Sequence, residues 1–270
     1  MKGDGGSIAS FLLQPLKYNP IPAKTMPANT SSNSRFAVII PVYNHGSTLK
    51  AVAEAALALG WPVYVVDDGS TDQGSVGLAN TPGLHLLRLE VNRGKGAALM
   101  TGFEAVAGQA DWAITLDADG QHNPWEAHRL IGAIPQDQRA IIIGRRQQMA
   151  AEGAPWTSRF GRGFSNFWIR MAGGPRVIDS QSGFRIYPLP EVLHLGVAAR
   201  RYQFEIEVLV KAAWSGLAVV ETPISVRYEP KGRRISHFRP FVDFCRNTGT
   251  FARLITRRVV LGKPRKTSHL

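Results

Sequence analysis

Residues 113–121 read Ala-Ile-Thr-Leu-Asp-Ala-Asp-Gly-Gln, an apolar run that leads directly into two carboxylates one residue apart. A similar arrangement occurs twice upstream. Residues 63–66, Val-Tyr-Val-Val, lead into a pair of aspartates, and residues 37–40, Ala-Val-Ile-Ile, lead into a proline and a polar turn. Short apolar runs bounded by turn-forming residues are typical of buried strands. These three runs therefore predict three strands of one sheet.

The residues between these runs predict helices. Residues 48–59 carry apolar side chains on more than one helical face, residues 96–107 are rich in alanine, and the run at 84–89 predicts a further strand. Strands that alternate with helices of ten or more residues imply a parallel, doubly wound sheet. We therefore expect an α/β fold with a mostly parallel central sheet and helices on both faces. Later segments continue it: an apolar run at 140–143, a helix at 204–213 and an extended run at 218–228.

The ends of three predicted strands should lie together. In doubly wound sheets, ligands bind outside the carboxyl ends of the strands. The polar residues at these ends are Tyr43 and Asn44, Asp67 and Asp68, and Asp117 and Asp119. Two carboxylates one residue apart suit Mg²⁺ or Mn²⁺, which retains positions for diphosphate oxygens. Taken alone, Asp-Ala-Asp-Gly could equally be an ordinary acidic turn.

Composition and cysteine usage narrow the class of protein. With 270 residues, 44% of them hydrophobic, the chain can bury a full core. The single Cys245 cannot form an internal disulfide, which predicts a reducing compartment, the cytoplasm. No export signal is recognisable, and no run of about 20 apolar residues predicts a membrane span.

Positive charge gathers near one end of the chain. The formal net charge is +12, and residues 227–266 hold twelve Lys/Arg and two acidic residues, a net +10. Such a segment favours a polyanionic partner: nucleic acid, nucleotide phosphates or an anionic membrane surface. Apolar residues at 241, 244, 251, 254 and 255 have near-helical spacing. We predict either an amphipathic membrane-surface anchor or a helix packed on the domain with a solvated basic face. For the aromatic segment 161–171 the two alternatives are a helix that lies in the membrane interface and a core helix.

Four motifs together resemble inverting glycosyltransferase family 2. They are Ile-Ile-Pro-Val-Tyr-Asn at 39–44, Val-Val-Asp-Asp-Gly-Ser at 65–70, Asn-Arg-Gly-Lys-Gly at 92–96 and Asp-Ala-Asp-Gly-Gln-His at 117–122. The resemblance covers roughly residues 36–122. It implies a Rossmann-like nucleotide-diphospho-sugar transferase (GT-A) fold and a nucleotide-sugar donor. Gln121-His122 and the later Asp-Ser-Gln-Ser-Gly-Phe-Arg at 179–185 resemble the dolichyl-phosphate mannosyltransferase and polyprenyl-phosphate glycosyltransferase branch.

The resemblance also implies residue roles. The metal ligands for Mg²⁺ or Mn²⁺ would be Asp117, Asp119 and Gln121, and the catalytic carboxylates Asp119 and Asp179. The nucleotide-sugar would be met by Pro41, Tyr43, Asn44, Asp67, Asp68, Arg93, Lys95 and Asp117. A lipid phosphate should be met by arginines, because a guanidinium binds phosphate oxygens in pairs. Among Arg145, Arg146, Arg159 and Arg162, we select Arg146 and Arg159, although solvated surface arginines are an equal alternative.

Asp179 has two readings. It would be a base if the acceptor were a hydroxyl of a lipid or glycan, but a phosphate acceptor is already anionic and needs no strong base. The expected function is inverting transfer of a sugar to a polyprenyl-phosphate-type lipid by an enzyme peripheral to the cytoplasmic membrane face. The expected organisation is a flexible leader at 1–34, a catalytic domain at 35–235 and a basic amphipathic segment at 236–270.

Two other classes fit less well. Sugar nucleotidyltransferases usually carry a Gly-rich loop with Arg and Lys after the first strand, whereas this chain has Pro-Val-Tyr-Asn at 41–44. A nucleic-acid-binding module would explain the basic segment through phosphate attraction. The sequence shows no helix-turn-helix, zinc finger or RNA-stacking motif, so we expect no nucleic-acid partner. The sugar, the nucleotide base and the oligomeric state are not predicted.

Overall fold

The computed structural model describes residues 34–147, 156–227 and 240–261. Only the backbone is described for residues 156–160, 162, 240–247 and 261. The leader predicted at 1–34 lies outside the described residues except for Ser34, and so do residues 228–239 and 262–270 of the basic region.

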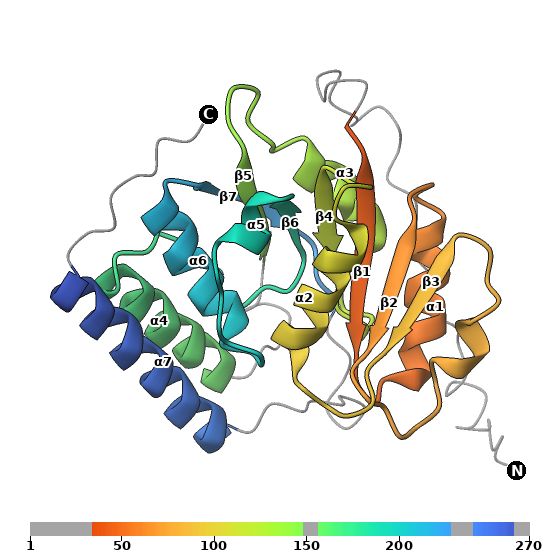
Figure 1. Cartoon of the computed structure of the whole chain (residues 1–270), viewed down its shortest axis with the longest axis horizontal. Helices are drawn as coiled ribbons and strands as arrows, with labels where there is room; N and C mark the ends of the chain where they lie inside the picture. The colour runs from red at the N-terminus through yellow and green to blue at the C-terminus, as the bar shows by residue number, and fades with distance from the viewer. Residues whose placement is uncertain (1–33, 148–155, 228–239, 262–270) are drawn as a thin grey trace, which may run out of the picture.

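A seven-stranded sheet forms the centre of the molecule, with strand order β3-β2-β1-β4-β6-β5-β7 (Figure 1). All neighbouring strands are parallel except that β6 runs antiparallel to both β4 and β5. The predicted mostly parallel sheet is therefore confirmed. The strands are β1 (Phe36–Val42), β2 (Val63–Asp67), β3 (Leu84–Arg88), β4 (Trp112–Thr115), β5 (Ala140–Arg146), β6 (Arg185–Pro188) and β7 (Ala218–Ile224).

Helices cover both faces of this sheet. They are α1 (Gly46–Leu57), α2 (Lys95–Val106), α3 (Ala127–Ile131), α4 (Trp156–Met171), α5 (Glu191–His194), α6 (Phe204–Ser215) and α7 (Pro240–Leu261), with short 3-10 turns η3 (Val76–Leu78) and η4 (Pro124–Glu126). α1 begins two residues before its predicted start. The reason is a distant cap: the Gly46 N–H donates to Asp72 Oδ2 over 2.8 Å, a contact that helical periodicity cannot reveal.

Strand β1 explains why the apolar runs lack alternation. Ala37 and Ile39 belong to a core cluster with α2 and α6, whereas Val38 and Ile40 belong to a second cluster with α1 and α3. All seven residues of β1 are buried because helices cover both faces.

The C-terminal helix packs onto the same body. Phe251 and Leu254 of α7 are 2% and 1% exposed and join the core cluster that includes α2 and α6. Arg253 Nη2 lies 2.7 Å from Glu207 Oε2 of α6. Arg258 Nη1 donates to the Met171 carbonyl of α4 over 2.8 Å, and Figure 1 shows α7 running alongside α4. Part of the predicted basic segment therefore packs on the domain.

Within the described ranges, no helix is both long enough and apolar enough to cross a membrane.

Candidate active site

The polar strand ends meet because β2, β1 and β4 are neighbours in the sheet. Parallel pairing places Val42 opposite Asp67, and Ile39 opposite Thr115, two residues before Asp117. The three loops that leave these strands therefore lie at one edge of the sheet. This is the edge where doubly wound folds bind ligands.

The first loop is tied to the second by Asn44. Its backbone has φ +53°, in the left-handed region that asparagine tolerates better than most residues. Its side-chain oxygen accepts from the Thr71 N–H over 2.8 Å, and its own N–H donates to Ser70 Oγ over 3.0 Å. Pro41 is buried in β1 and Tyr43 is half-buried. The nucleotide roles of these three residues stay predictions.

Asp67 organises the loop that follows β2. It is fully buried, and its Oδ1 accepts from the Ser70 N–H over 2.7 Å while its Oδ2 accepts from the Ser75 hydroxyl. Burial alone would raise the pKa of this carboxyl, but the hydrogen bonds from Ser70 and Ser75 outweigh it and lower the pKa.

Asp68 joins the second loop to the third. It is 2% exposed and accepts the backbone N–H groups of Arg93 and Gly94, each over 2.7 Å. Here burial outweighs those two hydrogen bonds, so the pKa of Asp68 is raised. Each oxygen of both aspartates thus accepts a hydrogen bond from the protein. Their contact with a nucleotide stays a prediction.

Lys95 opens α2 and lies between two carboxylates. Its Nζ is 2.7 Å from Asp117 Oδ1 and 2.5 Å from Glu205 Oε1. Burial opposes the charge on Lys95, yet the attraction of Asp117 and Glu205 prevails and raises the pKa of the ammonium. For Asp117, burial works against ionisation, but Lys95 lowers the pKa of the carboxyl. The pair is therefore an ion pair at neutral pH.

Asp119 differs from Asp117 in its electrostatics. Burial and repulsion from Asp117 raise the pKa of Asp119 to about 6, although its Oδ1 accepts from the Gln121 N–H over 3.0 Å. Gln121 in turn accepts the Arg227 N–H through its carbonyl. Among the residues that the structure describes, no group of three or more His, Cys, Asp or Glu side chains could hold a metal ion. The protein thus supplies two adjacent carboxylates here.

His122 follows this loop into the interior. It is 4% exposed, its ring centroid lies 5.5 Å from that of Phe184, and its Nδ1 has no hydrogen-bond partner among the described residues. Burial lowers the pKa of His122 to about 4, despite the nearby Asp117. The imidazole is therefore neutral at physiological pH.

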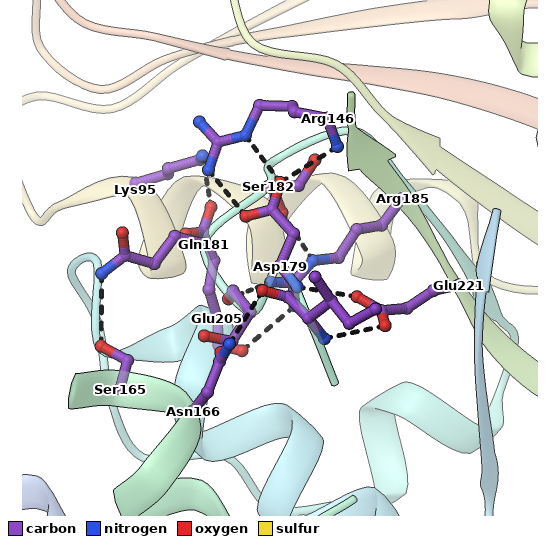
Figure 2. Close-up of polar contacts among 12 residues, drawn as sticks. Lys95, Arg146, Ser165, Asn166, Asp179, Gln181, Ser182, Arg185, Glu205 and Glu221 are labelled. Atoms are coloured by element: carbon purple, nitrogen blue, oxygen red, sulfur yellow. Dashed lines mark hydrogen bonds and ion pairs between the residues drawn. The ribbon is translucent and has the colours of Figure 1, made fainter. Parts of the chain in front are cut away.

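Asp179 and Arg146 contact each other, which the sequence did not predict. Asp179 is fully buried, and Arg146 Nε and Nη2 donate to its two oxygens over 2.8 Å each. The Arg146 N–H adds a third contact of 3.1 Å to Oδ2. Glu221 accepts the N–H groups of Ile178 and Asp179, both over 2.8 Å, and Figure 2 shows Asp179 between Arg146 and Glu221.

Three further residues that sequence reasoning missed shape this region. Buried Arg185 donates to the carbonyls of Ser180 and Ser182, both over 2.7 Å, and so holds the loop after Asp179 (Figure 2). A Cβ on Gly183 would lie 2.3 Å from Asp117 Oδ2 and 2.6 Å from Lys95 Nζ, so a larger residue there would displace the Asp117 and Lys95 side chains. The third is Glu205. A signal existed for two of them, because Arg185 and Glu205 interrupt apolar runs.

The two predicted acceptor residues lie on different elements, α4 and β5. Arg159 lies in α4, but its side chain is outside the described part of the chain. Arg146 is in place at the end of β5, with 17% of its side chain exposed.

Comparisons with known proteins agree on the family that this chain resembles. Residues 37–189 match the sequence profile described as Glycosyl transferase family 2. A UDP-N-acetylglucosamine–dolichyl-phosphate N-acetylglucosaminyltransferase of Methanococcus voltae is 30% identical over 213 residues, covering 71% of this chain and 85% of the relative. The polyprenol monophosphomannose synthase of Mycolicibacterium smegmatis is 29% identical over 219 residues, covering 74% and 80%.

The fold has solved counterparts. The crystal structure of mannosyl-3-phosphoglycerate synthase from Rubrobacter xylanophilus superposes with a TM-score of 0.60 at 16% identity, covering 88% of this chain and 77% of that one. At this identity the likeness concerns the fold alone.

Proposed function

The chain belongs to glycosyl transferase family 2, and from that premise we propose that it transfers a sugar from a nucleotide-diphospho-sugar to a polyprenyl phosphate. Its fold is the Rossmann-like GT-A type that the sequence motifs predicted. The proposal includes inversion at the anomeric carbon, a divalent metal at Asp117, Asp119 and Gln121, and action at the cytoplasmic membrane face.

The chemistry of the Asp117–Asp119 loop fits a divalent cation. Burial, together with repulsion from Asp117, raises the pKa of Asp119 to about 6, and a hard cation would offset both effects by balancing the charge. Mg²⁺ is typically held by one or two carboxylates together with substrate phosphates and water, which matches a loop that offers two. When bound, the metal would stabilise the charge that develops on the departing nucleoside diphosphate.

The proposed phosphate acceptor rests on the ion pair between Asp179 and Arg146. A base must present a free oxygen to the hydroxyl it deprotonates, but each oxygen of buried Asp179 accepts hydrogen bonds from Arg146. This arrangement favours an acceptor whose oxygen is already anionic, as in a phosphate monoester. Asp179 then orients the Arg146 guanidinium, which supplies positive charge near the acceptor phosphate.

Lys95 would contribute on the donor side. Its ammonium stands at the N-terminus of α2 beside Asp117, where backbone N–H groups and the helix dipole also favour anions. The names of the relatives support both substrates: one names a UDP-sugar and a dolichyl phosphate, and the other names a phosphomannose joined to a polyprenol.

The surface formed by α4 and α7 supports a membrane-peripheral location. Phe167 and Met171 of α4 and Val259 and Val260 of α7 are more than half exposed. The sequence of α4 contains no acidic residue, and α7 contains only Asp243. Exposed apolar side chains among arginines are suited to the boundary of an anionic bilayer. Co-sedimentation with anionic vesicles, set against DNA over a salt series, tests this part; preference for DNA would contradict it.

The test of the reaction compares two acceptors that differ in one group. The purified chain is incubated with a panel of nucleotide-sugars, Mg²⁺ or Mn²⁺, and either undecaprenyl phosphate or undecaprenol. We expect nucleoside diphosphate release with the phosphate only. Equal release with the alcohol would favour hydroxyl transfer with Asp179 as base. In a separate incubation with a nucleoside triphosphate and a sugar 1-phosphate, pyrophosphate release would indicate a nucleotidyltransferase.

A further inference from the structure

Glu205 is the third member of the charged group around Lys95, and it lies outside the four sequence motifs and outside the family match at residues 37–189. It lies in the first turn of α6, 6% exposed, with its Oε1 2.5 Å from Lys95 Nζ. The other partner of Lys95 is Asp117, at 2.7 Å. One ammonium is therefore shared between a predicted metal ligand and a carboxylate from a distant part of the chain.

The position of Glu205 is firmly held. Its carbonyl accepts from Arg185 Nη1 over 3.1 Å, and the same guanidinium holds the loop that follows Asp179. On the other side, α6 contacts the start of α2 closely, since a Cβ on Gly96 would lie 2.6 Å from Phe204 Cβ. The Glu205 side chain is thus aimed at Lys95 by rigid neighbours.

Sharing the ammonium has a consequence for Asp117. A buried ammonium that loses its anionic partner carries a large desolvation penalty, so Lys95 would resist leaving Asp117 if that were its sole carboxylate. Glu205 provides a second carboxylate on which Lys95 can remain. An incoming cation can then take over the oxygens of Asp117 without stranding the lysine charge.

We infer that Glu205 is a positioning residue for the donor site: it holds Lys95 so that Asp117 can bind the cation of a metal–nucleoside diphosphate. The inference rests on the proposed function for the identity of that ligand. It does not depend on which sugar is transferred or on the lipid acceptor.

The test measures binding of Mn²⁺ alone, and of Mn²⁺ with UDP or with GDP, by the paramagnetic resonance signal of free Mn²⁺. In Glu205→Gln the side chain keeps its shape and can still accept from Lys95, but its charge is lost. We expect Mn²⁺ affinity to fall about tenfold, the scale of losing an outer-shell partner. Glu205→Asp should recover part of the affinity, and Glu104→Gln, an exposed carboxylate on α2, should leave it unchanged.

Repeating the measurement in the Lys95→Gln variant distinguishes a positioning role of Glu205 from a general structural role. If Glu205 acts through Lys95, adding Glu205→Gln to Lys95→Gln changes Mn²⁺ affinity no further. An equal loss in both backgrounds, unchanged affinity in folded Glu205→Gln, or absence of Mn²⁺ binding to the wild-type chain overturns the inference. If Lys95→Gln does not fold, the comparison of Gln, Asp and Glu at position 205 still decides. Failure of the lipid-phosphate assay alone would count against the proposed function and leave this result standing.

Discussion

Two pairs of aspartates follow parallel strands in this molecule, yet their surroundings differ. Asp67 and Asp68, after β2, are 0% and 2% exposed, and each of their oxygens accepts a hydrogen bond from the protein. Asp117 and Asp119, after β4, are partly exposed and repel each other, and Lys95 forms its close ion pair with Asp117. The oxygens of the first pair are hydrogen-bonded within the protein, whereas the second pair carries negative charge that a bound cation would balance.

The comparison indicates that a pair of aspartates after a strand can either stabilise the surrounding loops or act in the site. A carboxylate that accepts backbone N–H groups stabilises the loops that carry the site. Asp119, whose pKa is raised to about 6 by burial and by the charge of Asp117, has the near-neutral pKa that is typical of functional positions. Changes in the first pair should therefore act on stability, and changes in the second on activity.

The largest expected effect is on turnover. Asp119→Asn should reduce nucleoside diphosphate release from the best nucleotide-sugar by on the order of 10²–10³-fold, because metal stabilisation of developing charge supplies several kcal/mol. The variant should fold normally, since Asn retains the oxygen that accepts from the Gln121 N–H. The measurement is steady-state release with Mg²⁺ or Mn²⁺ and undecaprenyl phosphate, with Glu104→Gln as the control. Full turnover in Asp119→Asn would remove the basis for distinguishing the two pairs.

The next effect concerns stability in the first pair. Asp68→Asn should destabilise the protein by about 1–3 kcal/mol, because both Asp68 oxygens accept N–H groups and the new amide N–H₂ must face one of these donors. Asp67→Asn should cost less, about 1 kcal/mol or below, because the Ser75 hydroxyl can reverse and accept. Urea unfolding of the two variants measures the difference. An equal loss of stability in the two variants would show that the stability of this loop depends on the charge of the aspartates and not on the pattern of hydrogen-bond donors around them.

The sequence predicted the strands and the loops at their ends because these depend on local periodicity and on turn-forming residues. It placed Asp67, Asp68, Asp117 and Asp119 at one edge of the sheet, as the structure does. It did not distinguish the pairs, since the donors that satisfy Asp68 lie 25 and 26 residues away.

Longer-range features escaped the sequence altogether. Glu205 meets Lys95 across 110 residues, and β6 enters the sheet antiparallel between β4 and β5. Arg146 and Asp179 were both selected, for separate roles, but their ion pair depends on how the strands bring β5 beside the loop before β6. Such contacts follow from strand order, which no local pattern in this chain specifies.

The smallest expected effect is a difference between Asp119 and Asp117 in how each contributes to stability as the pH changes. Stability is measured in the presence of a chelator, without metal. The folded pKa of Asp119, about 6, lies above the unfolded value of about 3.9, so ionising Asp119 costs stability as the pH rises from about 4 to 6. Asp119→Asn should therefore raise the free energy of unfolding at pH 7, by about 1 kcal/mol after allowing for partial exposure, with no gain at pH 4.

Asp117 should behave in the opposite sense. Its pKa is lowered in the folded state, so its contribution is present above about pH 4 and is lost as the pH falls through the folded pKa. Asp117→Asn should therefore lower stability at pH 7, because Lys95 loses one of its two carboxylates while Glu205 keeps the other. If thermal unfolding shows that both variants change stability in the same direction at pH 7, the proposed difference between Asp117 and Asp119 is wrong. Opposite signs would mean that Lys95 stabilises one carboxylate of the loop and leaves its neighbour's charge to be balanced by a bound cation.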